Sequence, residues 1–313
     1  MNFPAHIEGL ARATLPARPL HLAIGMFDGV HLGHRRVIET AVQSARAANG
    51  ISGILTFWPH PSALFRPEQP TKMILPAETR ARVLLTLGVD AVITEPFTLE
   101  LAAVPAEEFL PWLKQRLPGL VSVHVGDNFR FGRGRRGDVA VLVASGRTHG
   151  VEVFSAPRLN LGGEPISSTR IRALLEAGEL ASANALLGFP YFAEGVVTPG
   201  KQLGRTIGFP TLNLAWSPDL RPRLGVYAVR VSGAKAAGVH PAVANYGLRP
   251  TVEQAIAPRL EAHLLGECPF GEGDAVKVGW LSFLRPELKF AGVEALRAQI
   301  EVDRRDAARF FGG

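Results

Sequence analysis

The first half of the chain alternates short apolar segments with amphipathic ones, and this alternation most constrains the fold. Strand-like segments are predicted at 21–24, 52–57, 91–94, 121–125 and 151–156. Helix-like segments are predicted at 35–49, 76–87, 106–115, 139–146, 168–177 and 181–187. Strands that alternate with helices pair in parallel, because each helix returns the chain to the same end of the sheet. The pattern therefore predicts a Rossmann-like α/β domain, a parallel sheet with helices on both faces.

The sequence changes in character near residue 189. Beyond it, strand-like segments are short, β-branched and separated by glycine and proline, at 193–198, 211–214, 225–231, 242–245, 259–265 and 274–281. Such a series predicts an antiparallel β-barrel, and a segment from about residue 293 to 310 predicts a terminal helix that covers it. A chain of 313 residues is long enough for two domains. We therefore expect an α/β domain over residues 1–187 and an all-β domain over 188–313.

Composition narrows the class of protein. The chain is 47% hydrophobic and 20% charged, and no apolar run reaches the roughly 18 residues that a membrane span requires. We expect no membrane association, no secretory leader and, with Cys268 as the single cysteine, a reducing cytoplasmic location. The formal net charge of +6 is modest for this length, and no RNA-binding motif or zinc-finger spacing accompanies it. Anionic small-molecule substrates account for the charge without a nucleic-acid partner.

The segment from Gly25 to His34 follows the first predicted strand and leads into the first predicted helix. His31 and His34 are three residues apart at the start of that helix, so they can share one face. Free backbone N–H groups and the positive end of the helix dipole favour a bound phosphate there. A surface pair or half of a metal site is the alternative. The preceding strand and the spacing of Gly25, Gly29 and Gly33 favour nucleotidyl transfer from a nucleoside triphosphate.

Three further segments place polar or aromatic groups where predicted strands end or helices begin, at 57–61, 126–132 and 166–172. In the last, Ser167 or Ser168 is a suitable N-cap, and Arg170 can pair bidentately with phosphate oxygens. Helix capping alone is the alternative. The string 132–137 has the form G-x-G-x-x-G but begins too far past its strand for a dinucleotide fingerprint. We interpret it as a basic loop near nucleotide phosphates.

Together these segments resemble the prokaryotic bifunctional riboflavin kinase/FMN adenylyltransferase family, also called FAD synthetases, along nearly the whole chain. The stretch 25–34, Gly-Met-Phe-Asp-Gly-Val-His-Leu-Gly-His, is similar to the nucleotidyltransferase signature, and 166–172, Ile-Ser-Ser-Thr-Arg-Ile-Arg, to a second one. In the second half, 204–213, 245–251 and 260–263 resemble the riboflavin kinase signatures. Many adenylyl- and cytidylyltransferases share the first signature, but the kinase signatures in the same chain make the resemblance specific.

The resemblance implies two consecutive reactions. The second domain transfers the γ-phosphate of ATP to riboflavin, and the first transfers AMP from a second ATP to FMN, which gives FAD and pyrophosphate. It implies catalytic roles for His31, His34 and Arg170. It implies nucleotide or phosphate contacts from Gly25, Phe27, Asp28, Gly29, Asn128, Ser168 and Thr169. It implies flavin contacts from Phe57, His60, Phe65 and Phe129.

For the second domain, the resemblance implies that the reaction uses Mg²⁺ and that Glu261 is the general base for a substrate hydroxyl. It also implies ATP contacts from Gly204, Arg205 and Thr206. The residues are compatible with this assignment, because Thr211 and Asn213 are two apart on a predicted strand and point the same way. Their hydroxyl and amide oxygens are ligands that Mg²⁺ accepts. Simple turn chemistry is the alternative for that pair.

Two features depart from the family pattern. Leu212 stands where the family usually has alanine, but it should point away from its ligating neighbours. The loop 264–271 is shorter than in many relatives, which bears on kinase rate or flavin affinity. An adenylyltransferase whose barrel only binds flavin is one alternative, and a nucleic-acid or regulatory flavin-binding module is another. We expect a monomer or weak homo-oligomer that acts on riboflavin, FMN and ATP.

Overall fold

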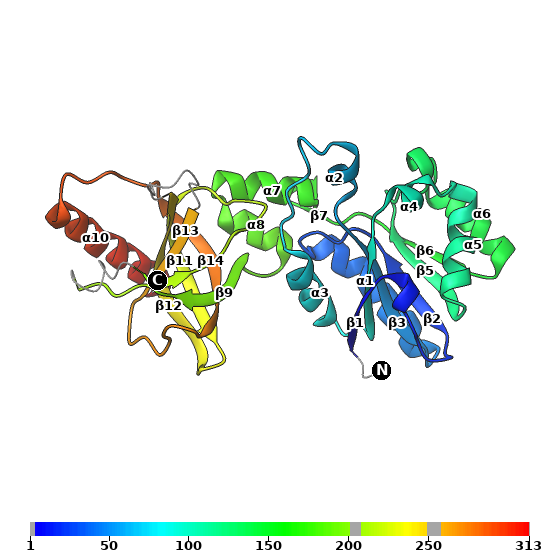
Figure 1. Ribbon diagram of the computed structural model, residues 1–313, viewed down its shortest axis with the longest axis horizontal. Coiled ribbons are helices and arrows are strands. Elements are labelled where there is room, and N and C mark those ends of the chain that lie inside the picture. Colours follow the sequence, from blue (N-terminus) through cyan, green and yellow to red (C-terminus); the bar gives the residue numbers. More distant parts are fainter. Residues whose placement is uncertain (1–3, 201–207, 249–257, 313) are drawn as a thin grey trace. The chain divides into compact units, whose positions relative to one another are not determined.

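The computed structural model describes residues 4–200, 208–248 and 258–312 (Figure 1). The chain divides into two compact units, Met1–Ser168 and Thr169–Gly313. In the described ranges no helix is long and apolar enough to cross a membrane.

The first unit contains a six-stranded parallel sheet with the strand order β1-β4-β3-β2-β5-β6. Its strands are β1 (Ala5–Glu8), β2 (Leu20–Ile24), β3 (Ile51–Trp58), β4 (Ala91–Pro96), β5 (Leu120–Gly126) and β6 (Glu152–Ala156). The five predicted strands are confirmed, with ends that differ by one or two residues. The sequence pattern does not predict β1, whose four residues are held at the sheet edge by pairing with β4.

Helices cover both faces of this sheet, as predicted (Figure 1). On one face, α5 packs Phe109 and Leu113 against Leu22 and the other even-numbered side chains of β2. On the other face, Thr40 of α1 contacts His124 of β5. The helices of this unit are α1 (Leu32–Ala47), α2 (Pro61–Phe65), α3 (Ala77–Leu85), α4 (Leu99–Ala103), α5 (Ala106–Arg116) and α6 (Val139–His149). Two short 3-10 turns, η1 (Leu10–Arg12) and η2 (Arg133–Arg135), and a small hairpin, β7 (Asn160–Leu161) and β8 (Glu164–Pro165), complete the unit.

The strand order reverses at β2, which lies between β3 and β5. From β2 the chain passes to β3 and β4 on one side, and then returns to β5 and β6 on the other. In open parallel sheets, ligands bind outside the carboxyl ends of the strands at such a reversal. The segment after β2, which carries the two histidines, and the segment after β5 therefore meet at the edge where this fold favours a ligand.

The second unit is a closed barrel in which neighbouring strands are antiparallel, with the order β10-β13-β12-β11-β14-β9. Its strands are β9 (Phe192–Thr198), β10 (Leu212–Leu214), β11 (Gly225–Gly233), β12 (Ala236–Leu248), β13 (Pro258–Leu264) and β14 (Ala275–Arg285). The helices α7 (Ser168–Ala177) and α8 (Leu180–Leu187) precede the barrel, and α10 (Val293–Gly312) follows it.

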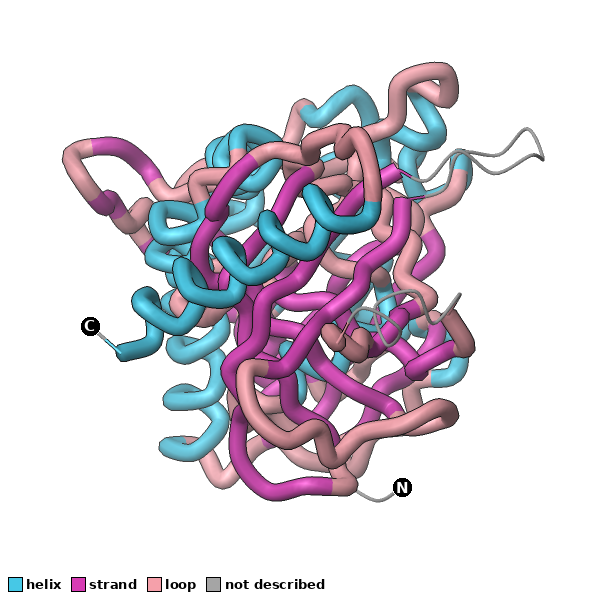
Figure 2. Tube along the Cα trace, turned by 90° about the vertical axis from the view of Figure 1, so that its left-hand side faces the viewer, coloured by secondary structure: helices cyan, strands magenta, loops and turns pink. Residues whose placement is uncertain are grey.

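The barrel has an aromatic interior and an outer face covered by α10. Inside, Trp280 packs against Tyr227 and Tyr246, with ring centroids 4.7 and 5.5 Å apart. Outside, Val226 and Val243 pack in one cluster with α10, and Figure 2 shows this C-terminal helix lying across the strands. The predicted barrel and its terminal helix are confirmed.

The helices α7 and α8 pack with the barrel. The side-chain amide of Asn184 in α8 accepts from the backbone N–H of Tyr191 at 2.7 Å and donates to the Trp280 carbonyl at 2.8 Å. The backbone N–H of Arg223 donates to the Leu175 carbonyl of α7 at 3.1 Å. These contacts explain why the compact unit begins at residue 169, whereas the alternating pattern of the sequence extends to residue 187.

Candidate active sites

The loop between β2 and α1 has an uncommon backbone that neighbouring segments hold in place. Phe27 and Val30 each have φ of 46°, and Gly29 has φ of 79°. Non-glycine residues avoid this left-handed region, and β-branched ones do so above all. The buried Asp28 supports the turn, because its carboxylate accepts from the backbone N–H of Ile74 at 3.0 Å. Such conformations persist only where the surroundings fix them, which is typical of functional sites.

A series of ring contacts leads from this loop to the two histidines. The Phe27 ring lies so close to Gly25 that a Cβ there would be 3.0 Å from it, so a larger residue would displace the ring. The same ring meets His34 edge-on, with centroids 5.3 Å apart. His34 in turn stacks on His31, with 3.5 Å between centroids and 15° between planes. Gly33 leaves room for His31, since a Cβ there would lie 3.2 Å from that ring.

His31 is the N-cap of α1, and its tautomer follows from the cap. Its Nδ1 accepts from the backbone N–H of His34 at 3.2 Å, so the ring hydrogen is on Nε2 and is available to donate. Burial lowers the pKa of His31 to about 4. Burial, and then the charges of His31 and Arg80, lower the pKa of His34 well below its ordinary value. The structure thus brings the predicted pair together at a helix N-terminus as two neutral imidazoles.

Other residues predicted to contact phosphate lie after β5 or in the first turn of α7. Asn128 is exposed just past the end of β5. Ser168 begins α7, and its hydroxyl donates to the Asp28 carbonyl at 2.9 Å, which joins the second signature to the strained loop. Thr169 and Arg170 follow in the first turn of α7 and belong to the second unit. Their contacts with a nucleotide remain a prediction.

A row of aromatic rings runs from the core of the first unit to its surface. Phe57 in β3 is buried, and its ring lies 6.1 Å from that of Phe97, which follows β4. Phe97 lies 6.3 Å from Phe65 in α2, which is 61% exposed. The row includes two residues predicted to contact flavin, Phe57 and Phe65. Sequence reasoning missed Phe97 because it belongs to no motif.

The other two residues predicted to contact flavin have partners elsewhere in the unit. Phe129 stacks on Phe131, with centroids 5.4 Å apart. His60 is the N-cap of α2, where its Nδ1 accepts from the backbone N–H of Ser62 at 3.1 Å. Both rings thus have partners outside the row that contains Phe57 and Phe65, and their contact with flavin remains a prediction.

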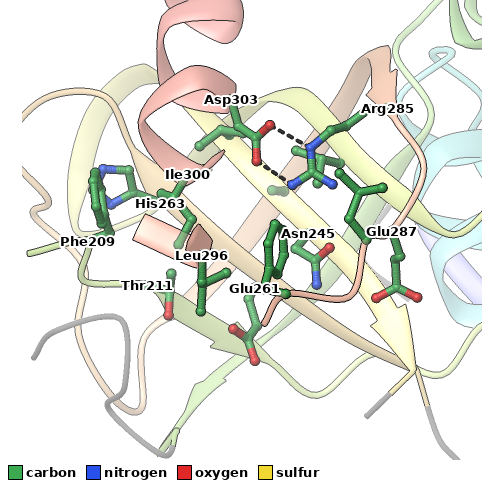
Figure 3. Close-up of a pocket in the computed structure, with 15 residues that line it drawn as sticks. Phe209, Thr211, Asn245, Glu261, His263, Arg285, Glu287, Leu296, Ile300 and Asp303 are labelled. Carbon is green, nitrogen blue, oxygen red and sulfur yellow. Dashed lines mark hydrogen bonds and ion pairs between the residues drawn. The ribbon is translucent and has the colours of Figure 1, made fainter. Parts of the chain in front are cut away.

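A pocket of about 190 Å³ lies on the outer face of the barrel, under α10 (Figure 3). The strands β11, β12 and β13 supply one side of it. The segment after β14 and the first turns of α10 supply the other, through Leu288, Phe290, Leu296 and Ile300. An apolar wall with a few polar groups is typical of a site for a small organic ligand.

Glu261 on β13 stands in a row of polar residues across neighbouring strands. In the strand register it lies opposite Asn213 on one side and Asn245 on the other. Thr211 and Glu261 both line the pocket, and in Figure 3 their oxygens point to the same side of it. Leu212 is buried, so it points away from Thr211 and Asn213, as predicted. Sequence reasoning assigned Asn245 no role beyond its place in a signature.

The oxygen donors of Thr211 and Asn213, beside Glu261, fit a hard divalent cation. The Thr211 hydroxyl and the Asn213 amide are ligands of the kind that Mg²⁺ takes, and they leave positions for phosphate oxygens and water. Gly200 leaves space for Asn213, because a Cβ there would lie 2.8 Å from the Asn213 Cγ. Outside the described residues lie the predicted ATP contacts Gly204, Arg205 and Thr206.

An ion pair closes one side of the pocket. Arg285, at the end of β14, donates through Nε and Nη2 to the two carboxylate oxygens of Asp303 on α10, both at 2.6 Å. Gln299 also donates to Asp303 at 2.9 Å. This bidentate geometry is that of a strong arginine–carboxylate pair, and it ties α10 to the barrel. Sequence reasoning missed the pair because its members belong to no motif.

The fold and the two sites define a nucleotide-binding α/β domain joined to a barrel that has a ligand pocket of its own. Residues 15–170 match the FAD synthetase family, and residues 187–311 match the riboflavin kinase family. The bifunctional riboflavin kinase/FMN adenylyltransferase of Escherichia coli K12 is 38% identical over 306 residues, which cover 98% of this chain and 96% of the relative. That of Listeria monocytogenes is 38% identical over 298 residues, which cover 93% and 92%. The chain belongs to the family of bifunctional riboflavin kinase/FMN adenylyltransferases.

A solved structure shares this fold. It is described as a macrolide-efflux protein from Streptococcus pneumoniae, and it matches with a TM-score of 0.86 at 27% identity. The match covers 97% of this chain and 98% of that one, so it includes both units.

Proposed function

We propose that this chain makes FAD from riboflavin in two steps. The barrel transfers the γ-phosphate of ATP to riboflavin, which gives FMN and ADP. The α/β unit transfers AMP from a second ATP to FMN, which gives FAD and pyrophosphate. The observation that carries the proposal is the presence of two separate candidate sites in one chain, one with the stacked His31–His34 pair and one with Glu261. Membership of the family supports the same assignment.

In adenylyl transfer, a phosphate oxygen of FMN attacks the α-phosphorus of ATP, and the bond from that phosphorus to the pyrophosphate oxygen breaks. The attacking phosphate is already ionised, so the step needs hydrogen-bond donors more than a base. His31 supplies its Nε2–H at the start of α1, where the helix dipole also favours negative charge. His34, Asn128, Ser168, Thr169 and Arg170 complete the proposed binding of nucleotide and phosphate.

In phosphoryl transfer, a riboflavin hydroxyl attacks the γ-phosphorus of ATP, and the bond from that phosphorus to the bridging oxygen of ADP breaks. The hydroxyl proton passes to the carboxylate of Glu261. Thr211 and Asn213 would hold Mg²⁺, which neutralises charge on the phosphates when bound. The apolar wall formed by Leu296 and Ile300 suits the flat flavin rings beside these polar groups.

The proposal also includes the cellular location, the substrates, the oligomeric state and the domain border of the enzyme. It acts in the cytoplasm on riboflavin, FMN and ATP, as a monomer or weak homo-oligomer, with a functional border between residues 187 and 188. The single free cysteine, Cys268, agrees with a reducing compartment.

The decisive experiment follows FMN and FAD by chromatography after incubation with riboflavin, ATP and Mg²⁺. In the double variant His31→Ala/His34→Ala, FMN should accumulate and FAD should not form. In Glu261→Gln, which keeps the shape and removes the base, the kinase rate should fall by about 10²- to 10⁴-fold. That variant should still make FAD from supplied FMN. Equal loss of both activities in either folded variant would contradict the assignment, and FAD formation from FMN alone in the wild type would favour a barrel that only binds flavin.

A further inference from the structure

Arg80 on α3 is a buried arginine to which the two reactions assign no part. Its side chain is 0% exposed, and burying a guanidinium is unfavourable unless its N–H groups find partners. Nη1 donates to the Met26 carbonyl at 3.1 Å, and Nη2 donates to the Phe57 carbonyl at 2.9 Å. Its Nε has no hydrogen-bond partner among the described residues. A neutral residue would avoid the cost of burying a charge, so the presence of an arginine here indicates a role beyond packing.

The two carbonyls that accept from Arg80 belong to the carboxyl ends of neighbouring strands. Met26 follows β2 by two residues, and Phe57 lies near the end of β3. The Met26 carbonyl also accepts from the Thr56 hydroxyl at 3.0 Å. Arg80 therefore clamps the start of the β2–α1 loop to β3, one residue before Phe27 enters its left-handed conformation.

The position of the loop is transmitted to the histidines by direct contact. Phe27, the residue after Met26, packs its ring edge-on against His34, and His34 stacks on His31. A displacement at Met26 would therefore move the Nε2–H of His31 relative to the reacting phosphorus. Misplacement by about 1 Å typically lowers a rate by about 100-fold.

We propose that Arg80 is a positioning residue for adenylyl transfer, which fixes the strained β2–α1 loop, and with it His31 and His34, by clamping the Met26 and Phe57 carbonyls. The inference rests on the proposed adenylyltransferase function of the first unit. Arg80 acts through the loop and touches no substrate.

The charge of Arg80 gives the proposal a second readout. The charged or titratable groups that act on His34 are His31 and Arg80, and Asp28 acts on Arg80 in turn. The positive guanidinium helps to keep the pKa of His34 low. Its removal should raise that pKa and so protonate His34 at a higher pH.

The test compares three variants of the full-length chain. Arg80→Met keeps the length of the side chain and removes the charge and donors, Arg80→Lys keeps the charge and one donor, and Arg82→Met alters an exposed arginine of the same helix. For FMN adenylylation, Arg80→Met should lower kcat by about 10- to 100-fold while KM for ATP and FMN changes by less than about threefold. Arg80→Lys should fall between Arg80→Met and the wild type, and Arg82→Met should match the wild type.

Riboflavin kinase activity, measured in the same samples, should be unchanged in all three variants and reports that the second unit is intact. The urea unfolding transition of the first unit, which contains Arg80, reports that this unit is folded. The acidic limb of the kcat profile should move to higher pH in Arg80→Met and stay in place in Arg80→Lys, which keeps the charge near His34. The inference is overturned, and the proposed function stands, if the wild type is active and the kcat of Arg80→Met lies within about twofold of the wild-type value. The same holds if the acidic limb of Arg80→Met does not move. If Arg80→Met loses riboflavin kinase activity as well, the test rests on Arg80→Lys. Wild-type adenylylation by Arg80→Lys would then contradict the proposed clamping of the two carbonyls. A wild type without adenylylation overturns the proposed function, and the inference with it.

Discussion

The imidazole of His31 has two tasks that substitution can separate. Its Nδ1 caps α1 by accepting from the backbone N–H of His34, and its Nε2–H is the proposed donor to the reacting phosphate. Asparagine is a good N-cap but lacks the second donor, so His31→Asn should keep the cap and lose the catalytic group. We expect His31→Asn and His31→Ala each to lower FMN adenylylation by about 10²- to 10³-fold. Only His31→Ala should lower the free energy of unfolding, by about 1 kcal/mol.

Adenylylation kinetics and urea unfolding of the first unit measure the two effects. A His31→Asn variant with wild-type adenylylation would show that the ring donor is not required. Equal losses of stability in both variants would show instead that the cap depends on the imidazole itself.

The protonation state of the histidine pair gives a second prediction at this scale. Because burial lowers the pKa of His31 to about 4 and that of His34 well below its ordinary value, both rings stay neutral from pH 8 to pH 6. The kcat of adenylylation should therefore show no histidine titration across this range, and it should fall only as the pH approaches the lowered values. Loss of activity as the pH rises through about 6.5 would mean that an imidazolium is the active form.

The terminal helix depends on a buried charge pair. Asp303 is 5% exposed, so Asp303→Ala would leave the Arg285 guanidinium without its carboxylate and should destabilise the barrel by about 3–5 kcal/mol. The double replacement Arg285→Met/Asp303→Leu should restore most of that loss, because it removes both charges. Glu301→Ala breaks an exposed pair with Arg304 on the same helix and should change the stability of the barrel far less than Asp303→Ala.

Thermal unfolding of the barrel and the KM for riboflavin measure this role. KM should rise in Asp303→Ala, since Leu296 and Ile300 of α10 wall the pocket. An Asp303→Ala variant as stable as Glu301→Ala would contradict the account of α10.

Local patterns predicted most of the elements, and contacts distant in sequence account for what they missed. The five long strands of the first unit follow from apolar runs, whereas β1 is defined only by pairing with β4. A signal for the two buried charges did exist. Arg80 falls on the buried face of α3 with Ala81 and Leu84, and Asp303 is spaced with Ile300 and Ala307 on α10. A charged residue within an apolar stripe predicts a buried partner, but the pattern does not identify which residue that partner is.

At the scale of the whole molecule, the first unit should be sensitive to acid. Burial lowers the pKa of four of its histidines, His21, His31, His34 and His124. Because their folded-state pKa lies below 6.5, the unfolded chain binds more protons below that pH, and stability is lost as the pH falls toward 4. For His31 and His124, each lowered to about 4, the loss at the acid limit is about 3 kcal/mol per residue.

Calorimetry at pH 7 and pH 5 measures this loss. The unfolding transition of the first unit should move to lower temperature at pH 5, and riboflavin kinase activity should outlast adenylylation on acidification. A first-unit transition that stays in place between the two values would contradict the buried neutral state of these rings.

The two units should also be separable, and the contacts of α8 indicate where. Residues 188–313 contain Thr211, Asn213, Glu261 and α10, so this fragment should phosphorylate riboflavin without the first unit. It lacks Asn184, however, whose amide pairs with the backbone N–H of Tyr191 and the carbonyl of Trp280. A buried backbone group that loses its partner costs about 1–3 kcal/mol. A fragment of residues 169–313 should therefore have a higher Tm than 188–313, at similar kinase activity.

Asn184→Ala in the longer fragment isolates the cause, because it removes the amide and keeps the two helices. It should lower Tm part of the way toward that of 188–313, since the packing of α7 remains, including the hydrogen bond from Arg223 to Leu175. Equal Tm values for the two fragments would show that α8 adds nothing to the barrel. A folded 169–313 fragment that binds riboflavin but does not phosphorylate it would show that the kinase needs the first unit, and that the pocket under α10 is a binding site without an independent catalytic machinery.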